Sequence, residues 1–264
     1  MKNITVIKIG GSTMGSRDTT IEDLVALQGQ GKSLVVVHGG GNRVTEWLKR
    51  QGVTTEFVRG ERVTDSAALE VAIAVLAGLV NKEIVAAINN LGGRAVGISG
   101  IDGSLVEGRV KNRAMGYVGE AVNINPAILE TLLQSGFLPI VSSMSLHAID
   151  KPAGAAQILN INADPTAGDL SAALGADKLV FLTNVAGIND ASGKVIPRLS
   201  AKEAQSLVES GVISGGMIPK LNACLTALNA GAIARIIDGR QPHALTSEFA
   251  GQNGGTTIYE ESDD

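Results

Sequence analysis

The stretch Ile4-Thr5-Val6-Ile7-Lys8-Ile9-Gly10-Gly11 decides the fold. Its β-branched run predicts a strand buried on both faces, as in parallel sheets. Lys8 stands between two isoleucines near the carboxyl end of this run, where open α/β sheets bind ligands. Gly10 and Gly11 then allow backbone N–H groups to approach an anion. We therefore predict a phosphate-binding turn, with a solvated lysine at the end of a strand as the alternative.

The same pattern recurs further along the chain. Leu34–Val37 is a second buried run, followed by His38-Gly39-Gly40-Gly41 and then by a helical pattern over Val44–Arg50. Strand, glycine turn and helix in repetition predict an α/β fold, a three-layer αβα sandwich with a central, mainly parallel sheet. Further strands are expected at Ala95–Ser99, Leu138–Ser142, Lys178–Leu182, Arg235–Asp238 and Thr256–Tyr259.

The regions between these strands are less regular. Thr55–Thr64 predicts a hairpin, and Asp65 is a candidate N-cap for a long helix that extends to Leu91. The glycine-rich segment Gly100–Val122 suggests hairpins over the edge of the sheet. A second series of alternating strands and helices begins after Gly175. It suggests an N-terminal lobe over residues 1–175 and a C-terminal lobe over residues 176–264.

Composition narrows the functional classes. The 264 residues are 44% apolar and 18% charged, which suits one folded α/β unit or two intimate lobes. The net charge of −4 without a basic block predicts no nucleic-acid binding. Cys224 is the sole cysteine, so no intrachain disulfide can form. The first residues look like a strand rather than a signal peptide, and the apolar run Val71–Val80 is too short to cross a bilayer. We expect a cytoplasmic protein with no membrane partner.

Two later motifs add candidate charges. In Asn160-Ile161-Asn162-Ala163-Asp164, the two asparagines would share one face of an extended segment, and Asp164 begins a helix. Asp164 could be a plain N-cap, or it could hold the phosphate-binding lysines in place. Gly215-Gly216-Met217-Ile218-Pro219-Lys220 is a glycine loop that leads into a helix. A lysine in a first helical turn is electrostatically unfavourable unless an anion lies nearby, which suggests phosphate.

Standard nucleotide-binding motifs are absent. Gly10 and Gly15 have P-loop spacing, but Ser16-Arg17 follows them instead of Lys-Ser/Thr. No G-x-G-x-x-G follows the first strand, and the three histidines have no metal-ligand spacing. Arg62 could grip a substrate carboxylate as a two-pronged fork, or it could be an exposed hairpin arginine.

Together, seven segments in order resemble the amino acid kinase family, and within it the members that phosphorylate N-acetyl-L-glutamate. The resemblance runs over essentially the whole chain. The segments that carry it are Lys8–Gly11, Val37–Gly41, Gly60–Thr64, Leu79–Lys82, Asn160–Asp164, Thr183–Ile188 and Gly215–Lys220.

The resemblance implies transfer of the γ-phosphoryl group of ATP to the side-chain carboxylate of N-acetyl-L-glutamate, a step of arginine biosynthesis. Mg²⁺ would be held mainly by the nucleotide phosphates, with no dedicated metal ligand. Lys8 and Lys220 would stabilise the transferring group, and Asp164 would orient them. Gly40, Gly41, Arg62 and Asn160 would bind the substrate. The implied nucleotide-binding residues are Gly10, Gly11, Asn184, Val185, Gly187, Ile188, Asn189, Val212, Ile213 and Ser214.

Family members inhibited by arginine carry an additional N-terminal helix, and its absence here implies a homodimer, built on the long helix, without arginine feedback. Two alternatives stay open. One is a kinase for α-aminoadipate or glutamate bound to a carrier protein. Such relatives tend to break the His-Gly-Gly-Gly run after its second glycine, whereas Gly41 is intact here. A carrier-dependent enzyme should also have a basic docking surface, and the sequence shows no basic cluster beyond Arg109, Lys111 and Arg113. The other is a non-catalytic nucleotide-binding regulator, which would be free to lose Lys8, Asp164 and Lys220.

Overall fold

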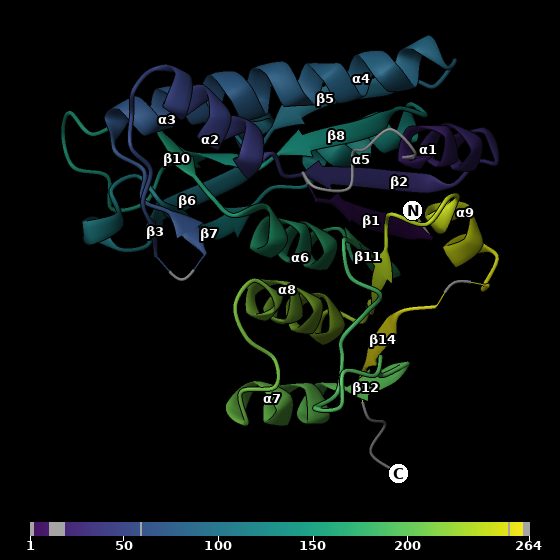
Figure 1. Ribbon diagram of the computed structural model, residues 1–264. Helices are drawn as coiled ribbons and strands as arrows, with labels where there is room; N and C mark the ends of the chain where they lie inside the picture. The colour runs from purple at the N-terminus through teal and green to yellow at the C-terminus, as the bar shows by residue number, and fades with distance from the viewer. Residues whose placement is uncertain (1–2, 11–18, 59, 253, 261–264) are drawn as a thin grey trace.

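The computed structural model describes residues 3–10, 19–58, 60–252 and 254–260. An eight-stranded sheet lies at its centre, in the order β12-β14-β13-β11-β1-β2-β8-β5. Neighbouring strands are parallel except for β13 and β14. Helices cover both faces of the sheet (Figure 1). The predicted αβα sandwich with a mainly parallel sheet is confirmed.

The central strands are β1 (Ile4–Ile9), β2 (Ser33–His38), β5 (Ala95–Ser99), β8 (Leu138–Ser142), β11 (Lys178–Thr183), β12 (Arg198–Ser200), β13 (Ile233–Asp238) and β14 (Thr256–Tyr259). A hairpin is formed by β3 (Phe57–Val58) and β4 (Glu61–Arg62), and a four-stranded sheet by β6 (Val106–Val110), β7 (Gly119–Ile124), β9 (Met144–His147) and β10 (Ile158–Asn160). The longer helices are α1 (Thr20–Gly29), α2 (Gly41–Arg50), α3 (Ser66–Ala72), η1 (Ile73–Val80), α4 (Asn81–Asn90), α5 (Ala127–Gln134), α6 (Ala163–Ala173), α7 (Ala201–Glu209), α8 (Met217–Asn229) and α9 (Ala244–Phe249). Two short 3₁₀ turns, η2 (Asp102–Ser104) and η3 (Arg113–Met115), lie around β6.

Strand alternation divides the core between the two faces. Ile4 and Val6 pack with α5, α6 and α8, whereas Ile7 and Ile9 pack with α1, α2 and the long helix α3-η1-α4. Because successive side chains point to opposite faces, Lys8 is directed to the α6 side. In β2 the same rule places His38 with Val36 on the side of the long helix. Two neighbouring strands therefore deliver a lysine and a histidine to opposite faces at one edge of the sheet.

The long helix is continuous from Ser66 to Asn90, and its middle section, η1, is π-helical. Asp65 caps it by accepting a hydrogen bond from the Ala68 amide at 2.8 Å, so the predicted N-cap is confirmed. The helix has 25 residues and a mean hydropathy of 2.0 in its most apolar window, enough to cross a membrane by length and composition. The expectation that the apolar run Val71–Val80 is too short to cross a bilayer therefore considered only part of this helix. Only 44% of that window is buried in the fold, and core helices pass the same test.

Several elements differ from the sequence-based expectations. The segment Gly100–Val122 does contain a hairpin strand pair, since β6 and β7 pair antiparallel, but they belong to the separate four-stranded sheet. The helix after the glycine loop already begins at Met217, so the loop is shorter than the expected Gly215–Lys220. Strands β9 and β10 and helix α9 were not anticipated. Cys224 is fully buried in α8.

Candidate active site

Three charged side chains from three separate elements meet beside the carboxyl edge of the sheet. Lys8 Nζ of β1 lies 2.6 Å from Asp164 Oδ1 of α6, and Lys220 Nζ of α8 donates a hydrogen bond to Asp164 Oδ2 at 2.6 Å. One carboxylate thus holds one ammonium group on each of its oxygens. The prediction that Asp164 contacts both lysines is confirmed by these contacts.

The alternative reading of Asp164 as an N-cap is wrong, because Asn162 occupies that position. Its extended backbone precedes α6, and its side-chain oxygen accepts a hydrogen bond from the Asp164 amide at 3.0 Å. Asn160 instead ends β10, so the two asparagines belong to different elements, although both line one cavity. With the cap supplied by Asn162, the Asp164 carboxylate is left to face the lysines.

Burial governs the electrostatics of this group, since Lys8 and Asp164 are 7% and 5% exposed. Burial lowers the pKa of Lys8, with the nearby Lys220 charge adding to the effect and Asp164 opposing it. Burial alone would raise the pKa of Asp164, but the ammonium groups of Lys8 and Lys220 outweigh it and hold that pKa below its ordinary value. The carboxylate stays ionised at neutral pH and faces two lysine side chains, an arrangement suited to a bound anion.

Close packing of α6 on α8 sets the geometry of the trio. Gly168 lies one turn after Asp164, directly against Ala223 of α8. A Cβ atom at Gly168 would lie 2.7 Å from the Ala223 carbonyl oxygen, which real structures do not tolerate without a shift of the backbone. Glycine at this position therefore allows the two helices to approach closely enough for Lys220 to reach Asp164.

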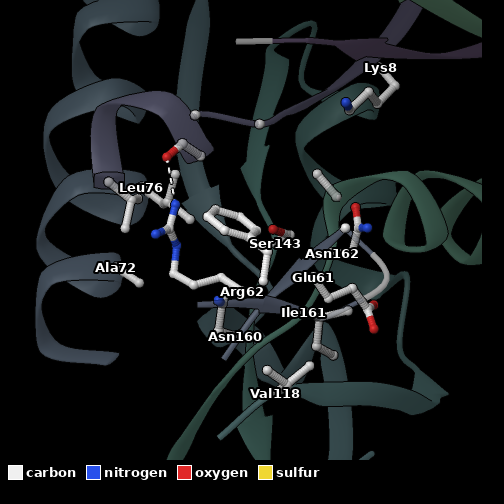
Figure 2. A pocket seen from close by; sticks show the side chains of 17 residues that line it. Lys8, Glu61, Arg62, Ala72, Leu76, Val118, Ser143, Asn160, Ile161 and Asn162 are labelled. Atoms are coloured by element: carbon white, nitrogen blue, oxygen red, sulfur yellow. Dashed lines mark hydrogen bonds between the residues drawn. The ribbon is translucent and has the colours of Figure 1, made fainter. Parts of the chain in front are cut away.

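A cavity of ≈ 230 Å³ opens beside Lys8 and is large enough for a small molecule. Figure 2 shows Lys8 and Arg62 on opposite sides of it, with Asn160 below Arg62. The substrate-binding residues expected from the sequence all line it, namely Gly40, Gly41, Arg62 and Asn160. Sequence reasoning did not predict the other lining residues, among them Val44, Phe57, Ala72, Leu76, Val118, Ser143 and Ile161.

Arg62 is buried rather than an exposed hairpin arginine. Its Nη2 donates to the Gly41 carbonyl at 2.8 Å and to Thr45 Oγ1 at 2.7 Å, while the guanidinium lies 4.6 Å from the centre of the Phe57 ring. Its buried Nη1 has no hydrogen-bond partner within the described residues. Burial lowers the pKa of Arg62, yet an arginine remains charged at physiological pH. A buried cation with a free donor beside a cavity is suited to a carboxylate.

Asn160 lies close to Arg62 in the cavity wall. Its Nδ2 donates to Thr64 Oγ1 at 3.2 Å, and Thr64 Oγ1 in turn donates to the Arg62 carbonyl at 2.8 Å. This chain ties β10 to the β3–β4 hairpin. Arg62 and Asn160 are thereby fixed relative to each other, as a shared ligand would require.

The expected nucleotide-binding residues fall into two groups. Asn184, Val185 and Asn189 are exposed after β11, and Ser214 is exposed before α8. By contrast, Ile188 and Ile213 are core residues, and Gly187 is buried. The Ile188 amide donates to Thr256 Oγ1 and its carbonyl accepts from Ile196, so its polar groups are already used by the fold. Val212 is partly buried, Gly10 lies at the end of β1, and Gly11 lies outside the described residues.

A second, larger cavity of ≈ 1030 Å³ lies between the hairpin and the start of α8. Gly60 and Glu61 form one wall, which they share with the smaller cavity, and Gly215 and Gly216 form another. Lys111 donates to both carboxylate oxygens of Glu61, at 3.0 and 2.8 Å. The glycine loop ahead of Lys220 therefore faces the pocket of Arg62 across an open cleft.

Known proteins are similar to this chain in sequence and in fold. An acetylglutamate kinase from Dehalococcoides mccartyi (strain CBDB1) is 46% identical over 256 residues, which cover 97% of this chain and 94% of the relative. The crystal structure of smu.665 from Streptococcus mutans UA159 superimposes with a TM-score of 0.82 at 28% identity, covering 99% of this chain and 100% of that one.

A second solved structure is the N-acetylglutamate synthase from Neisseria gonorrhoeae complexed with coenzyme A and N-acetyl-glutamate. It gives a TM-score of 0.84 at 27% identity and covers 98% of this chain, which spans 60% of the synthase chain. The model of the amino acid kinase family matches residues 3–238. The chain therefore belongs to the amino acid kinase family.

Proposed function

We propose that this chain transfers the γ-phosphoryl group of ATP to the side-chain carboxylate of N-acetyl-L-glutamate, as a step of arginine biosynthesis. The observation that carries the proposal is the pairing of Lys8 and Lys220 on Asp164, beside a small cavity that holds the buried Arg62. The 46% identity to an acetylglutamate kinase over nearly the full chain supports the choice of acceptor.

The site suits an acceptor with two carboxylates. The free donor of Arg62 would bind the α-carboxylate, with Asn160 beside it, while the side-chain carboxylate would reach towards Lys8 on the opposite side of the cavity. Asn184, Val185, Asn189 and Ser214, the exposed residues of the expected nucleotide set, would contact ATP. Residues 1–175 would serve the acceptor and residues 176–264 the nucleotide, which places the reacting groups between Lys8 and Lys220.

The chemical step needs charge stabilisation rather than proton transfer. A carboxylate oxygen attacks the γ-phosphorus, the bond from that phosphorus to the β–γ bridging oxygen breaks, and ADP leaves as the acyl phosphate forms. The acceptor is already ionised at neutral pH, so no general base is required. Lys8 and Lys220 would neutralise the charge that spreads over the phosphoryl oxygens, and Asp164 would keep both ammonium groups in place.

The same geometry bears on Mg²⁺. Both Asp164 oxygens are engaged by lysines, and no cluster of His, Cys, Asp or Glu among the described residues could hold a metal ion. We therefore propose that the ATP phosphates hold the Mg²⁺, which would offset the charge of the nucleotide.

The surroundings of the cavity favour a small free acceptor over a carrier-bound one. Arg109 is paired with Glu120, and Lys111 is paired with Glu61. Two of the three charges in the basic cluster Arg109, Lys111 and Arg113 are therefore neutralised by neighbouring carboxylates. A docking surface for an acidic carrier would need such charges to be available.

We also propose a homodimer in the cytoplasm, and the long helix Ser66–Asn90 supports the dimer. Ile73, Ala77 and Val85 are only partly buried on a helix whose apolar window is 44% buried, and a second copy could cover that surface. Sedimentation of the purified chain without detergent would test this. A dispersed species of twice the chain mass is expected, and a chain recovered only with membranes or detergent would refute it.

The decisive experiment is an ATP-dependent acyl-phosphate assay with hydroxylamine trapping. Hydroxamate should form with N-acetyl-L-glutamate and not with free glutamate, aspartate or N-acetyl-aminoadipate. Lys8→Ala and Lys220→Ala should each abolish most turnover while thermal unfolding stays cooperative. Activity only with a carrier-bound acceptor would replace the proposed substrate, and ATP binding without turnover on any acceptor would identify a non-catalytic regulator.

A further inference from the structure

A buried polar pair lies directly behind the glycine loop, on the face of the sheet opposite Lys8. His38 ends β2 and Asn81 begins α4, immediately after the π-helical section of the long helix. Their side chains are 2% and 0% exposed. Polar groups buried this deeply are expensive unless they are bonded, so their contacts have to be explained.

The contacts assign one role to each ring nitrogen of His38. Its Nδ1 lies 2.8 Å from the Gly39 carbonyl oxygen, which can only accept, so Nδ1 carries the proton. Nε2 then accepts from Asn81 Nδ2 at 3.2 Å. Burial lowers the pKa of His38 to about 4, despite the bond to the Gly39 carbonyl, and the positive charges of Lys8 and Lys82 act in the same direction. The ring is therefore neutral at physiological pH, the state in which it can make both bonds.

Asn81 is itself held firmly in place. Its Nδ2 lies 2.9 Å from the Ile140 carbonyl and 3.2 Å from the Ile98 carbonyl, and its Oδ1 accepts from Lys82 Nζ at 3.1 Å. A Cβ atom at Gly97 would lie 2.0 Å from Asn81 Oδ1, so β5 also leaves room for this amide. Asn81 thus links β5 and β8 to the histidine.

The bond from His38 fixes the direction of one peptide group. In a trans peptide the carbonyl and the following N–H point in opposite directions. The Gly39 carbonyl is turned towards the His38 ring on the side of the long helix, so the Gly40 N–H points the other way. Gly39 and Gly40 line the cavity that also contains Lys8 and Arg62, so an N–H turned away from the helix can reach a molecule bound there. Within the described residues, the Gly40 N–H donates to no protein acceptor.

Gly40 is also pressed against the long helix. Its φ of 148° is disfavoured for other residues, and a Cβ atom there would lie 2.8 Å from Leu76 Cδ2 of η1. The loop can therefore neither move towards the helix nor accept a side chain, and the hydrogen bond from His38 holds the Gly39 carbonyl from the other end.

We propose that His38 and Asn81 are positioning residues that lock the Gly39–Gly40 peptide with its N–H directed into the cavity, where it donates to the phosphoryl group in transfer. The part of this proposal that concerns the phosphoryl group rests on the proposed function. The lock itself is a statement about the direction of one peptide and can be tested separately.

Three substitutions at His38 separate the two ring nitrogens. The amide of His38→Asn places its Nδ2 near the position of the imidazole Nδ1 and keeps a donor for the Gly39 carbonyl. His38→Gln reaches towards Asn81 and leaves that carbonyl without its donor, and His38→Leu removes both bonds. We expect kcat to fall roughly a hundred-fold in the Gln and Leu variants, as when one oxyanion donor is lost, with the KM for ATP changed little. The Asn variant should stay within roughly ten-fold of the unmodified chain.

Asn81→Leu should reproduce the loss in kcat, because the imidazole then loses the group that orients it. The matched control is Asn89→Leu, two turns further along the same helix. Asn89 also bonds to backbone of the β5 region, through the Ala95 amide at 2.7 Å and the Ala95 carbonyl at 3.3 Å, but it does not contact the glycine loop. That control should lower the melting temperature and leave kcat unchanged.

Crystal structures of the His38→Leu and His38→Asn variants complete the test. A rotated Gly39–Gly40 peptide in the Leu variant, and the original peptide in the Asn variant, are expected. An unchanged peptide in the Leu variant, or equal losses of kcat in the Asn and Leu variants, would overturn the proposal. If the unmodified chain proves inactive on N-acetyl-L-glutamate, the proposed function fails, while the crystal structures still decide whether the peptide is locked.

Discussion

Replacing Asp164 by asparagine removes the charge that binds two lysines. The structure sets limits on the resulting loss in the free energy of unfolding. The side chains of Lys8 and Asp164 are 9% and 7% exposed, so solvent screens their interaction little. Removing one partner of such a buried pair destabilises a fold by about 3–5 kcal/mol. Lys8 can limit the loss by releasing its proton, which at pH 7 costs about 4.6 kcal/mol for an ordinary lysine pKa. We therefore expect a loss of about 3–4.6 kcal/mol, or roughly 6–18 °C in Tm.

The pH dependence distinguishes this explanation from a general loss of packing. In Asp164→Asn the folded state holds the Lys8 ammonium less readily than the unfolded chain does, so stability rises with pH. At pH 9.4 releasing the proton costs only about 1.4 kcal/mol, and the Tm deficit should shrink to roughly a third to a half of its value at pH 7. In the unmodified chain the pKa of Asp164 is lowered, so its contribution is present at neutral pH and is lost as the solution becomes strongly acidic.

The assay is thermal unfolding at pH 7 and pH 9.4, with hydroxamate formation measured on the same samples. Asp169→Asn is the matched control, since Asp169 lies on the same helix and burial raises its pKa to about 6. Because the pKa of Asp169 is raised in the folded state, the protein loses stability as the pH rises towards that pKa. Replacing Asp169 by asparagine should therefore raise the Tm at pH 7. Two results would refute the reasoning about Lys8, Asp164 and Lys220. One is a Tm of Asp164→Asn equal to that of the unmodified chain at pH 7, and the other is a Tm difference that does not shrink at pH 9.4.

Two further substitutions probe the site. Gly168→Val should separate α6 from α8 and lower kcat strongly, because its side chain would enter the space of the Ala223 backbone; activity equal to the unmodified chain would contradict the packing argument. Arg62→Lys should raise the KM for N-acetyl-L-glutamate roughly ten- to a hundred-fold with the KM for ATP little changed, since an ammonium cannot replace the buried guanidinium. Initial rates over a matrix of both substrates measure this, and equal shifts in both KM values would refute the assignment.

Much of this architecture could be predicted because it follows from local rules. Alternation along Ile4–Ile9 determines which face receives Lys8, and glycines directly after buried strands mark the functional edge of a parallel sheet. Phe57, Leu76 and Ser143 could not be recognised as cavity residues, because nothing local distinguishes an apolar or small side chain beside a cavity from one in the core. The choice between a capping and a charge-holding role for Asp164 also depended on tertiary contacts.

The missed elements have local causes as well. Helix α9 has only six residues and is preceded by His243 in the left-handed conformation, so its sequence carries little helical periodicity. Its start is stabilised from a distance, because Asp23 of α1 accepts from the Leu245 amide at 3.1 Å. The π-helical section Ile73–Val80 likewise lies inside an apolar pattern that predicts an ordinary helix.

The place of β1 in the sheet has a consequence for synthesis of the chain on the ribosome. This strand is made before the other strands of its sheet, yet one of its two neighbours, β11, begins only at Lys178. At translation rates of about 5–20 residues per second, roughly 10–35 s pass before that neighbour emerges. During this time β1 can pair with β2 on one side only, and its other edge stays open to strands from other chains. The first strand of this sheet to emerge is thus among the last to gain both neighbours, and a nascent chain would benefit most from chaperone protection at this strand.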